Sequence, residues 1–280
     1  MKTISPSTSQ LRMLASMRGQ QWLIRPDQIE GFALSALELG ENHAYLDDED
    51  FNEQRPGMSI DADGIAHIFI MGALMNKVAK IYERNGLATS YSTIIRETEE
   101  AKSSGASGIL YHIDSPGGTV AGVVEAGANI AGAGIPTASH CYGLACSAAY
   151  WLTSGTGAIV AAPSATVGNI GAILSWADCS GFWEEMGVEF KALTSQGADL
   201  KSTFYLEPNA DQIAFLQESI DEAGAAFRSH VETGRMAAAG NVLDAEVWRA
   251  GWYSGKKAEA LGLIDMVGTA YDAKVLLMRA

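Results

Sequence analysis

Between residues 58 and 176 the chain alternates short apolar runs with segments whose apolar residues recur at helical spacing. This alternation predicts an α/β fold in which mostly parallel strands are joined by right-handed helical crossovers. We expect strands over 65–71, 108–113, 135–141, 158–162 and 170–176, and helices over 91–103, 119–131 and 147–153. In sheets of this kind, functional groups gather at the carboxyl ends of the strands.

The first 57 residues have a different pattern. Arg25-Pro26-Asp27 indicates a turn and a helix start, because apolar residues then follow at helical spacing from Ile29 to Leu37. The acidic, polar stretch over 41–57 is typical of a linker. We therefore expect an N-terminal helical segment with its linker over 1–57 and an α/β domain over 58–280.

A long amphipathic helix is expected over 211–232, ahead of Gly234. Its apolar residues recur on one face and predict a buried stripe formed by Ile213, Leu216, Ile220, Phe227 and Val231. After the fifth strand an alternating segment over 188–193 predicts a further strand, with Lys191 pointing to solvent.

Composition excludes several function classes. The chain carries 48% apolar residues, a net charge of −14 and no dense cluster of Lys or Arg, so we expect no nucleic acid and no anionic membrane surface as partner. No run approaches the length of a membrane span, and residues 1–21 lack the apolar core of a secretory signal, so a cytoplasmic location is expected. The three cysteines have no paired metal-type spacing, and we expect neither a metal nor a cofactor.

Two loops that follow predicted strands carry unusual chemistry, Asp114 to Gly118 and Tyr142 to Ala149. Ser147 ends a turn that contains a glycine and opens a helix of small residues, which suits a nucleophile at the mouth of a pocket. The alternative is that Ser147 only caps this helix, since serine is a good N-cap residue. Cys146, its neighbour, is interpreted as a small buried apolar residue rather than a nucleophile.

The other loop could supply hydrogen-bond donors. Gly117 and Gly118 have no Cβ, so their backbone can approach a ligand closely and direct N–H groups at an oxygen, as can the N–H of Ala148. An ordinary Pro-Gly turn is the competing interpretation of Gly117-Gly118. The two loops are separated by one βα unit, which makes them neighbours at one sheet edge.

A base for Ser147 is harder to identify from the residues alone. Of the five histidines, His112 and His140 lie near the predicted strand ends, although core-facing strand positions are the simpler interpretation. Lysine becomes a base only when burial disfavours its charged form. Lys191 and Lys201 both follow the fifth strand, and a solvated surface position is the default for either.

Four motifs in order resemble the signal peptide peptidase A family of serine peptidases, over roughly residues 65–269, and within it the capsid-assembly proteases of tailed phages (minor capsid protein C branch). The motifs are Asp114-Ser115-Pro116-Gly117-Gly118, Ala145-Cys146-Ser147-Ala148-Ala149-Tyr150-Trp151, Val167-Gly168-Asn169-Ile170-Gly171 and Ala260-Leu261-Gly262-Leu263-Ile264-Asp265.

The resemblance implies a ClpP/crotonase-like β-β-α superhelix and a serine endopeptidase with a Ser–Lys dyad. It assigns Ser147 as nucleophile, Lys201 in the loop after Gly197 as general base, and the N–H groups of Gly118 and Ala148 as the oxyanion hole, with Gly117 in support. It implies scaffold, portal or capsid proteins as substrates, assembly into a homo-oligomer, and a place in the host cytoplasm or the procapsid.

This chain departs from the family pattern at two points. Asn169 stands where family members usually carry a serine that orients the lysine amine, although the side-chain carbonyl of Asn169 can also accept a hydrogen bond. The spacing from Gly197 to Lys201 is one residue longer than the family's. Three alternatives stay open: a cytoplasmic bacterial peptidase of the signal-peptide-peptidase type, a catalytically silent capsid-assembly component, and a crotonase-type acyl-CoA enzyme.

Overall fold

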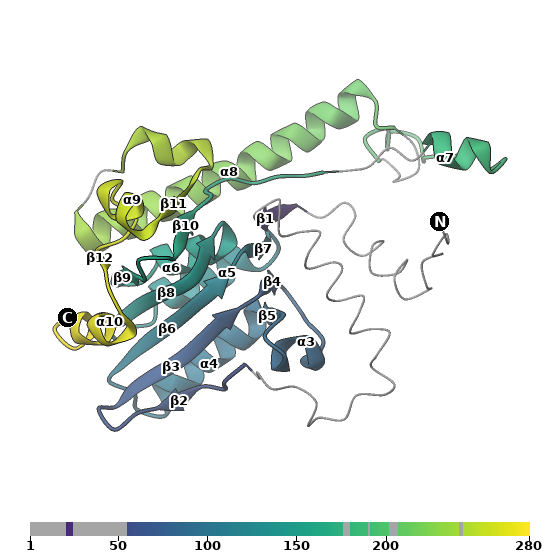
Figure 1. Cartoon of the computed structure of the whole chain (residues 1–280). Coiled ribbons are helices and arrows are strands. Elements are labelled where there is room, and N and C mark those ends of the chain that lie inside the picture. Colours follow the sequence, from purple (N-terminus) through teal and green to yellow (C-terminus); the bar gives the residue numbers. More distant parts are fainter. Residues whose placement is uncertain (1–20, 25–54, 176–179, 190, 202–206, 241–242) are drawn as a thin grey trace, which may run out of the picture.

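The computed structural model describes residues 21–24, 55–175, 180–189, 191–201, 207–240 and 243–280 (Figure 1). The strands are β1 (Trp22–Ile24), β2 (Ser59–Ile60), β3 (Ile65–Met71), β4 (Ala73–Met75), β5 (Ala88–Ser90), β6 (Gly108–Ser115), β7 (Gly117–Thr119), β8 (Thr137–Cys146), β9 (Ala158–Ala161), β10 (Thr166–Gly168), β11 (Trp252–Ser254) and β12 (Met266–Val267). The α-helices are α3 (Lys80–Arg84), α4 (Tyr91–Ser103), α5 (Val123–Ala131), α6 (Ala148–Ser154), α7 (Ser180–Glu185), α8 (Ala210–Ala239), α9 (Gly255–Ala260) and α10 (Ala270–Leu277), and a 3₁₀ helix spans Ala245–Arg249.

The strands form two sheets. The larger has the order β11-β10-β8-β6-β3-β2, with β9 beside β8 and β12 beside β9, and the smaller has the order β1-β7-β4-β5. Pairing within the larger sheet is parallel from β3 through β6 and β8 to β9 and β10, and antiparallel only at β2 and β11. The smaller sheet is parallel except for β1, which runs antiparallel to β7.

The chain passes from the larger sheet to the smaller one twice in the same way. Strand β3 continues into β4, and β6 continues into β7, each time across one residue. Helix α4 returns the chain to the larger sheet after β5, and α5 returns it after β7. This repeated β-β-α unit is the ClpP/crotonase-like arrangement, and the expected α/β class with a mostly parallel sheet is confirmed.

Helices cover both faces of the larger sheet. Helices α4, α5 and α6 lie against one face, and their buried residues join the main core, while α10 lies on the opposite face (Figure 1). Ala273 and Leu277 of α10 pack there against Ile65, Leu110 and Val160 in a smaller apolar cluster. The C-terminal half of α8 packs on α6, where Phe227 stacks on Trp151 with ring centroids 5.0 Å apart.

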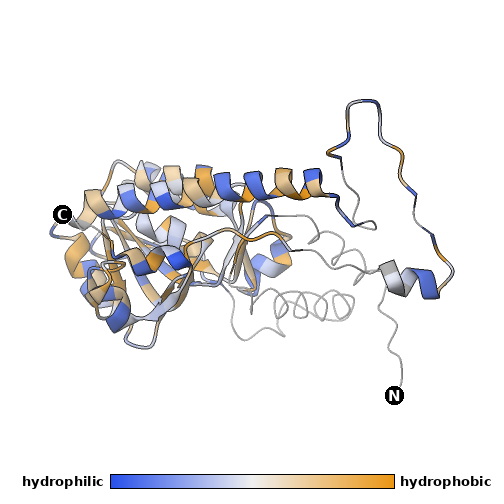
Figure 2. Ribbon diagram, turned by 90° about the horizontal axis from the view of Figure 1, so that it is seen from above, coloured by the Kyte–Doolittle hydropathy of each residue, from blue (hydrophilic) through white to orange (hydrophobic). Residues whose placement is uncertain are grey.

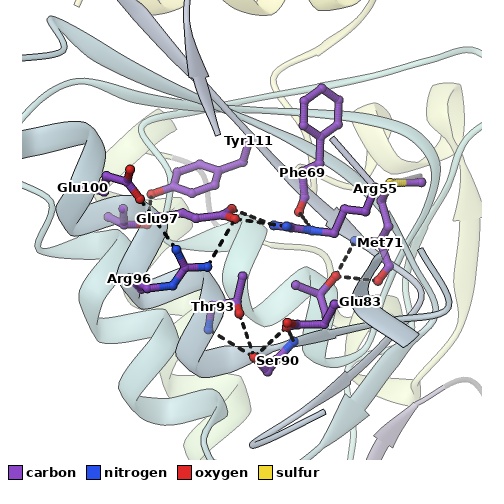
Figure 3. Close-up of polar contacts among 12 residues, drawn as sticks. Arg55, Phe69, Met71, Glu83, Ser90, Thr93, Arg96, Glu97, Glu100 and Tyr111 are labelled. Carbon is purple, nitrogen blue, oxygen red and sulfur yellow. Dashed lines mark hydrogen bonds and ion pairs between the residues drawn. The ribbon is translucent and has the colours of Figure 1, made fainter. Parts of the chain in front are cut away.

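Arg55, which the sequence assigns to the linker, is held by the α/β domain. Its guanidinium donates two hydrogen bonds to the Glu97 carboxylate, at 3.0 and 2.6 Å, and its Nε donates to the carbonyl oxygen of Phe69 on β3 (Figure 3). The two side chains are only 6% and 5% exposed, so each charged group is solvated mainly by the other instead of by water. The predicted boundary at residue 58 stays a prediction, but the chain is already fixed to the domain at Arg55.

Two strand predictions are wrong. The strand after β9 spans Thr166–Gly168 rather than 170–176, of which only Ile173 forms an isolated bridge. Gly168 and Asn169 both have positive φ, 119° and 58°, and they turn the chain out of the sheet before the apolar residues on which the prediction depended. The described residues between 188 and 193 form no strand either, although Lys191 points to solvent as expected.

Helix α8 is longer than predicted and is buried over only part of its length. Phe227 and Val231 are fully buried, but Ile213 is 42% exposed because the N-terminal half of α8 projects beyond the sheets (Figure 1). Gly234 lies inside the helix instead of after it, and a Cβ there would overlap the carbonyl oxygen of Ser154 on α6. The helix predicted near residues 29–37 lies outside the described residues.

Candidate active site

Ser147 lies between the end of β8 and the start of α6, in the interior of the protein. Its N–H donates to the carbonyl oxygen of Gly168 on the neighbouring strand β10, at 2.8 Å, and its own carbonyl accepts the first helical hydrogen bond from Trp151. The parallel register of β8 and β10 places Cys146 opposite Gly168. Ser147 is thus fixed on both sides by backbone, at the carboxyl ends of two adjacent strands.

The backbone of Ser147 is strained, with φ 54° and ψ −121°. Such a conformation costs a non-glycine residue about 1–3 kcal/mol and persists where the surrounding structure enforces it. The side chain is fully buried, its hydroxyl has no hydrogen-bond partner among the residues that the structure describes, and it makes no capping bond to α6. The capping interpretation therefore fails, and a sharp strand-to-helix turn with an unengaged hydroxyl is the geometry of a nucleophile.

The loop between β6 and β7 lies directly against Ser147. A Cβ at Gly117 would lie 2.9 Å from the Cβ of Ser147, and a Cβ at Gly118 would overlap the carbonyl of Leu74 on β4. Gly117 also has a φ of 108°, which side chains rarely tolerate. Both glycines are required by close backbone contacts, and the ordinary-turn interpretation does not account for them.

Two polar side chains set the shape of this loop. Ser115 donates from its hydroxyl to the carbonyl of Gly72, at 2.6 Å, and accepts from the N–H of Gly117. The Asp114 carboxylate accepts from the N–H of Leu144, at 2.8 Å. Asp114 therefore ties the glycine loop to the loop before Ser147, and the structure brings together the two strand ends as the sequence predicts.

Ala148 begins α6, so its N–H has no acceptor within the helix. It follows Ser147 directly, and Gly118 lies one residue beyond the glycine that contacts Ser147. The three predicted backbone contributors, Gly117, Gly118 and Ala148, are thus neighbours of Ser147.

Asn169 lies next to Gly168, the residue that fixes the N–H of Ser147. It is 7% exposed, its N–H donates to Gly251 at 2.7 Å, and its side-chain Nδ2 donates to the carbonyl of Ala250 at 2.8 Å. With the amide nitrogen engaged there, the side-chain oxygen Oδ1 is the group of Asn169 that could orient an amine.

Lys201 is not brought to Ser147 within a single chain. It is exposed, and its backbone bonds run to Ala198 and Gln212. The Ser147 hydroxyl has no hydrogen-bond partner, so the Lys201 amine is out of reach of it. Lys201 belongs to what we call the arm, the described residues 180–189, 191–201 and 207–215, which include the N-terminal end of α8 and project from the sheets (Figure 2).

The histidines near the strand ends do not approach Ser147. His112 stacks on Phe69 and bonds through Nε2 to Nδ1 of His67, at 2.9 Å, while His140 lies at the edge of His112. Burial, with the charges of His67 and His140, lowers the pKa of His112 to about 4. These rings form an aromatic cluster on the larger sheet, in line with the structural interpretation.

Cys146 lies in the interior, as the sequence predicts. Cys146 is fully buried and its Sγ contacts the carbonyl oxygen of Thr166, at 3.5 Å. Among the residues that the structure describes, no three His, Cys, Asp or Glu side chains gather as metal ligands. In the same part of the chain, no helix is long and apolar enough to cross a bilayer.

The sequence patterns did not predict one strand that lies beside the candidate site. Strand β1, Trp22–Ile24, pairs with β7 beside the glycine loop, with Leu23 opposite Gly118. The only signal in the sequence was an apolar triplet ahead of Arg25-Pro26, too short for any periodicity.

Comparison with known proteins gives a family match over the part of the chain that contains Ser147. The model of peptidase family S49 matches residues 130–280, more than half of the chain, a range that contains Ser147, Asn169 and Lys201. Capsid assembly protease C of Escherichia phage lambda is 28% identical over 256 residues, 90% of this chain and 57% of that protein. The head-tail preconnector protein GP5 of Enterobacteria phage P21 is 27% identical over 216 residues, 75% of this chain and 42% of that protein.

The chain thus spans about half the length of these relatives. A solved structure of a membrane-bound stomatin-specific protease mutant with a substrate peptide aligns over 75% of this chain and 78% of its own, at 16% identity and a TM-score of 0.43.

Proposed function

Because the chain belongs to peptidase family S49, we propose that it is a serine endopeptidase with Ser147 as nucleophile and Lys201 as general base. The observation that carries this proposal is the Ser147 hydroxyl, which is buried, unbonded and held on a strained turn against two glycines. A residue kept only for packing would gain stability by relaxing this turn or by becoming alanine.

In the proposed reaction an uncharged Lys201 amine takes the proton of Ser147 as its Oγ attacks the carbonyl carbon of the scissile peptide. The negative charge that develops on the carbonyl oxygen is stabilised by the N–H groups of Gly118 and Ala148. The Lys201 ammonium then returns the proton to the leaving amine, and water hydrolyses the acyl-enzyme. No metal or cofactor is needed for these steps.

Lys201 must come to Ser147 for this chemistry, and we propose that assembly of several copies brings it there. The arm exposes an unusual number of large apolar side chains, namely Met186, Val188, Leu193, Leu200, Ile213 and Phe215. Apolar surface of this extent favours contact with another protein surface. A second copy of the chain is the occupant proposed here, because a closed homo-oligomer would cover every arm in the same way.

Burial of Lys201 in such a contact would also make its amine a stronger candidate base than it is in the single chain, where it is exposed to water. Removal of water from the amine lowers the free-energy cost of its uncharged form, which is the form that acts as a base. In this proposal the Oδ1 of Asn169, whose Nδ2 is engaged with Ala250, accepts a hydrogen bond from that amine, in the role that the family resemblance gives to a serine.

The names of the relatives suggest the substrates. One relative is named a capsid assembly protease and another a head-tail preconnector protein, so we propose scaffold, portal or capsid proteins as the substrates of this chain. The reaction would then take place in the host cytoplasm or inside the procapsid.

A second candidate is an assembly component that keeps the fold without the activity. The exposed position of Lys201 and the presence of Asn169 favour it. The two candidates differ in one measurable property, the reactivity of the hydroxyl of Ser147.

The test combines a fluorophosphonate probe with three variants of the full chain. We expect the probe to modify Ser147 in the wild type, and expect Ser147→Ala and Lys201→Ala to abolish both labelling and cleavage of casein. Lys191→Ala is the matched control, because Lys191 lies on the same arm and is 77% exposed in an ion pair with Glu189. This control should label and cleave as the wild type does.

Two results would contradict the proposal. Wild-type rates in Ser147→Ala would exclude this nucleophile, and wild-type rates in Lys201→Ala would exclude this base. A chain that neither labels nor cleaves at any concentration at which it is assembled would favour the silent component.

A further inference from the structure

Strand β1 lies where an extended peptide would have to bind in order to reach Ser147. On one side it pairs antiparallel with β7, the strand that holds the glycine loop. On the other side Trp22 exchanges two hydrogen bonds with Ile173, each of 2.9 Å. An extended segment that is bonded on both edges occupies a groove, and this is the manner in which peptides add to sheet edges.

The register of β1 decides which of its carbonyl groups faces the site. Both polar backbone groups of Trp22 are directed at Ile173, so those of its neighbours Gln21 and Leu23 face β7. The N–H of Val120 indeed donates to the carbonyl of Gln21, at 3.0 Å. Two residues on, the same alternation directs the carbonyl oxygen of Leu23 at the N–H of Gly118, the proposed oxyanion donor.

The glycine loop places this carbonyl next to the nucleophile. A Cβ built on Gly117 would overlap the Leu23 carbonyl oxygen and would also lie 2.9 Å from the Cβ of Ser147. Leu23 and Ser147 are both fully buried, and the Ser147 hydroxyl is shielded from water with no partner. With β1 in this position, no other peptide can approach Ser147.

The side chains of β1 alternate as a bound substrate's would. Leu23 enters the main core, whereas Trp22 and Ile24 join a separate apolar cluster with Ala73 and Ala88 of β4 and β5. Beyond Gln21 the groove continues into an open pocket of about 550 Å³, lined by residues that follow β4 and β7.

We propose that β1 is the enzyme's own first substrate, bound with Leu23 before the scissile bond, and that Ser147 cleaves the chain between Leu23 and Ile24. The proposal rests on the serine peptidase function proposed above. It also states the specificity of the site, which should accept an extended segment with a branched apolar side chain at the position of Leu23.

The reaction balances as an ordinary peptide hydrolysis. The Ser147 oxygen bonds to the carbonyl carbon of Leu23, the bond from that carbon to the Ile24 nitrogen breaks, and the hydroxyl proton passes through the general base to that nitrogen. Water then adds to the ester, which releases Leu23 as a carboxylate and restores the Ser147 hydroxyl. The products are residues 1–23 and 24–280, with one water consumed.

Cleavage would open the groove without releasing the rest of the chain. Residues 24–280 stay anchored through the buried pair of Arg55 and Glu97. The upstream product is held by non-covalent contacts alone, such as that of Gln21 with Ser219 on α8. Once it dissociates, the pocket beside β7 and the glycine loop can receive another protein.

Mass spectrometry of the full chain tests the cleavage. We expect the wild type to lose residues 1–23 on incubation under conditions of assembly, and Ser147→Ala to stay intact. Leu23→Glu should block cleavage at this bond, because a carboxylate cannot replace a buried apolar side chain. Val124→Glu is the control: it adds the same charge at an exposed position of α5, and this variant should be cleaved normally.

A peptide assay tests the register independently of whether Leu23→Glu folds. A fluorogenic amide of Gln-Gln-Trp-Leu, the sequence of residues 20–23, should be hydrolysed by the processed enzyme at least about tenfold faster than the amide of Gln-Gln-Trp-Asp. Equal rates for the two amides would overturn the assigned position of Leu23.

The outcomes separate this proposal from the one on which it rests. A preparation that labels at Ser147 and cleaves casein, but stays whole or is cut at another bond, overturns the self-cleavage and leaves the peptidase function intact. A preparation that does neither, and in which Ser147 is unreactive, overturns the peptidase function itself.

Discussion

The region around Ser147 and the arm that carries Lys201 are built in opposite ways. Ser147 is fixed by strand β10, by α6 and by a glycine loop that leaves no room for a Cβ. Lys201 is exposed on a projecting segment that presents apolar side chains to water. The difference teaches that a single chain fixes the proposed nucleophile and the proposed oxyanion donors, whereas the position of the proposed base depends on what the arm contacts.

The largest effect is expected when the packed region is disturbed at Gly117. Gly117→Ala forces a Cβ into the Leu23 carbonyl and against Ser147, and a displacement of about 1 Å at a nucleophile costs on the order of a hundredfold in rate. The value of kcat/KM toward casein measures it. Gly105→Ala is the control, since Gly105 shares a positive φ but has nothing within 4 Å. Equal losses in both would mean that backbone strain, and not contact with the site, is responsible.

The next effect concerns the junction of the two regions, where Arg235 of α8 is fully buried. It donates to the Asp265 carboxylate, at 2.7 and 3.2 Å, and to the carbonyl of Gly262. Arg235→Leu removes the charged partner of Asp265, which keeps only the hydrogen bond from the N–H of Ile159, and should lower the free energy of unfolding by about 3 kcal/mol in urea titrations. Arg228→Leu removes an exposed pair with Glu232 and a cation–π contact with the Trp248 ring, 4.4 Å from its centroid, and should cost only about 1 kcal/mol.

A smaller effect is expected on the arm. Phe215→Asp puts a charge on the surface proposed to contact a second copy, so specific activity at micromolar concentration should fall about tenfold, with no change in melting temperature. Light scattering should show a parallel loss of assembly. Met236→Asp, exposed on the anchored half of the same helix, is the control. A wild type that is fully active as a monomer would end the role given to the arm.

The smallest effect is a pH dependence confined to the packed region. Burial lowers the pKa of His112 to about 4, from 6.5 in an exposed histidine. Above pH 6.5 the ring is neutral in both states, but between 6.5 and 4 only the unfolded chain binds the proton, so the folded state loses stability as the pH falls. The full shift corresponds to about 3 kcal/mol, and because the ring is partly exposed to solvent we expect a loss of about 1–2 kcal/mol, which His112→Gln should remove from urea midpoints measured across this range. An unchanged slope would assign it to other groups.

The sequence located the packed region well because its signals are local. Strand ends followed by Pro-Gly-Gly and by a glycine turn before Ser147 place both loops at one sheet edge, and the hydrogen bond from Leu144 to Asp114 joins them there. The proposal that Ser147 is the nucleophile rests on these motifs together with the family resemblance.

The parts that the sequence missed depend on distant partners. Strand β1 has three residues, and its pairing partners lie about a hundred residues and more away in the chain, so no periodicity could reveal it. The stripe predicted on α8 is apolar along its whole length. Such a pattern identifies the face of a helix that packs against another surface, but it does not identify that surface. Ile213 is accordingly exposed while Phe227 is buried.

The uneven burial of α8 gives the arm a mechanical character. The helix has 30 residues and is about 45 Å long, clamped at one end by Phe227, Val231 and Arg235 and unsupported at the other. Because only its C-terminal part is packed, a tilt of the helix by about 10° there would move its N-terminal end by about 4 Å. A small change in how Gly234 packs on α6 would therefore displace the N-terminal end of α8 and change the position that Lys201 can occupy.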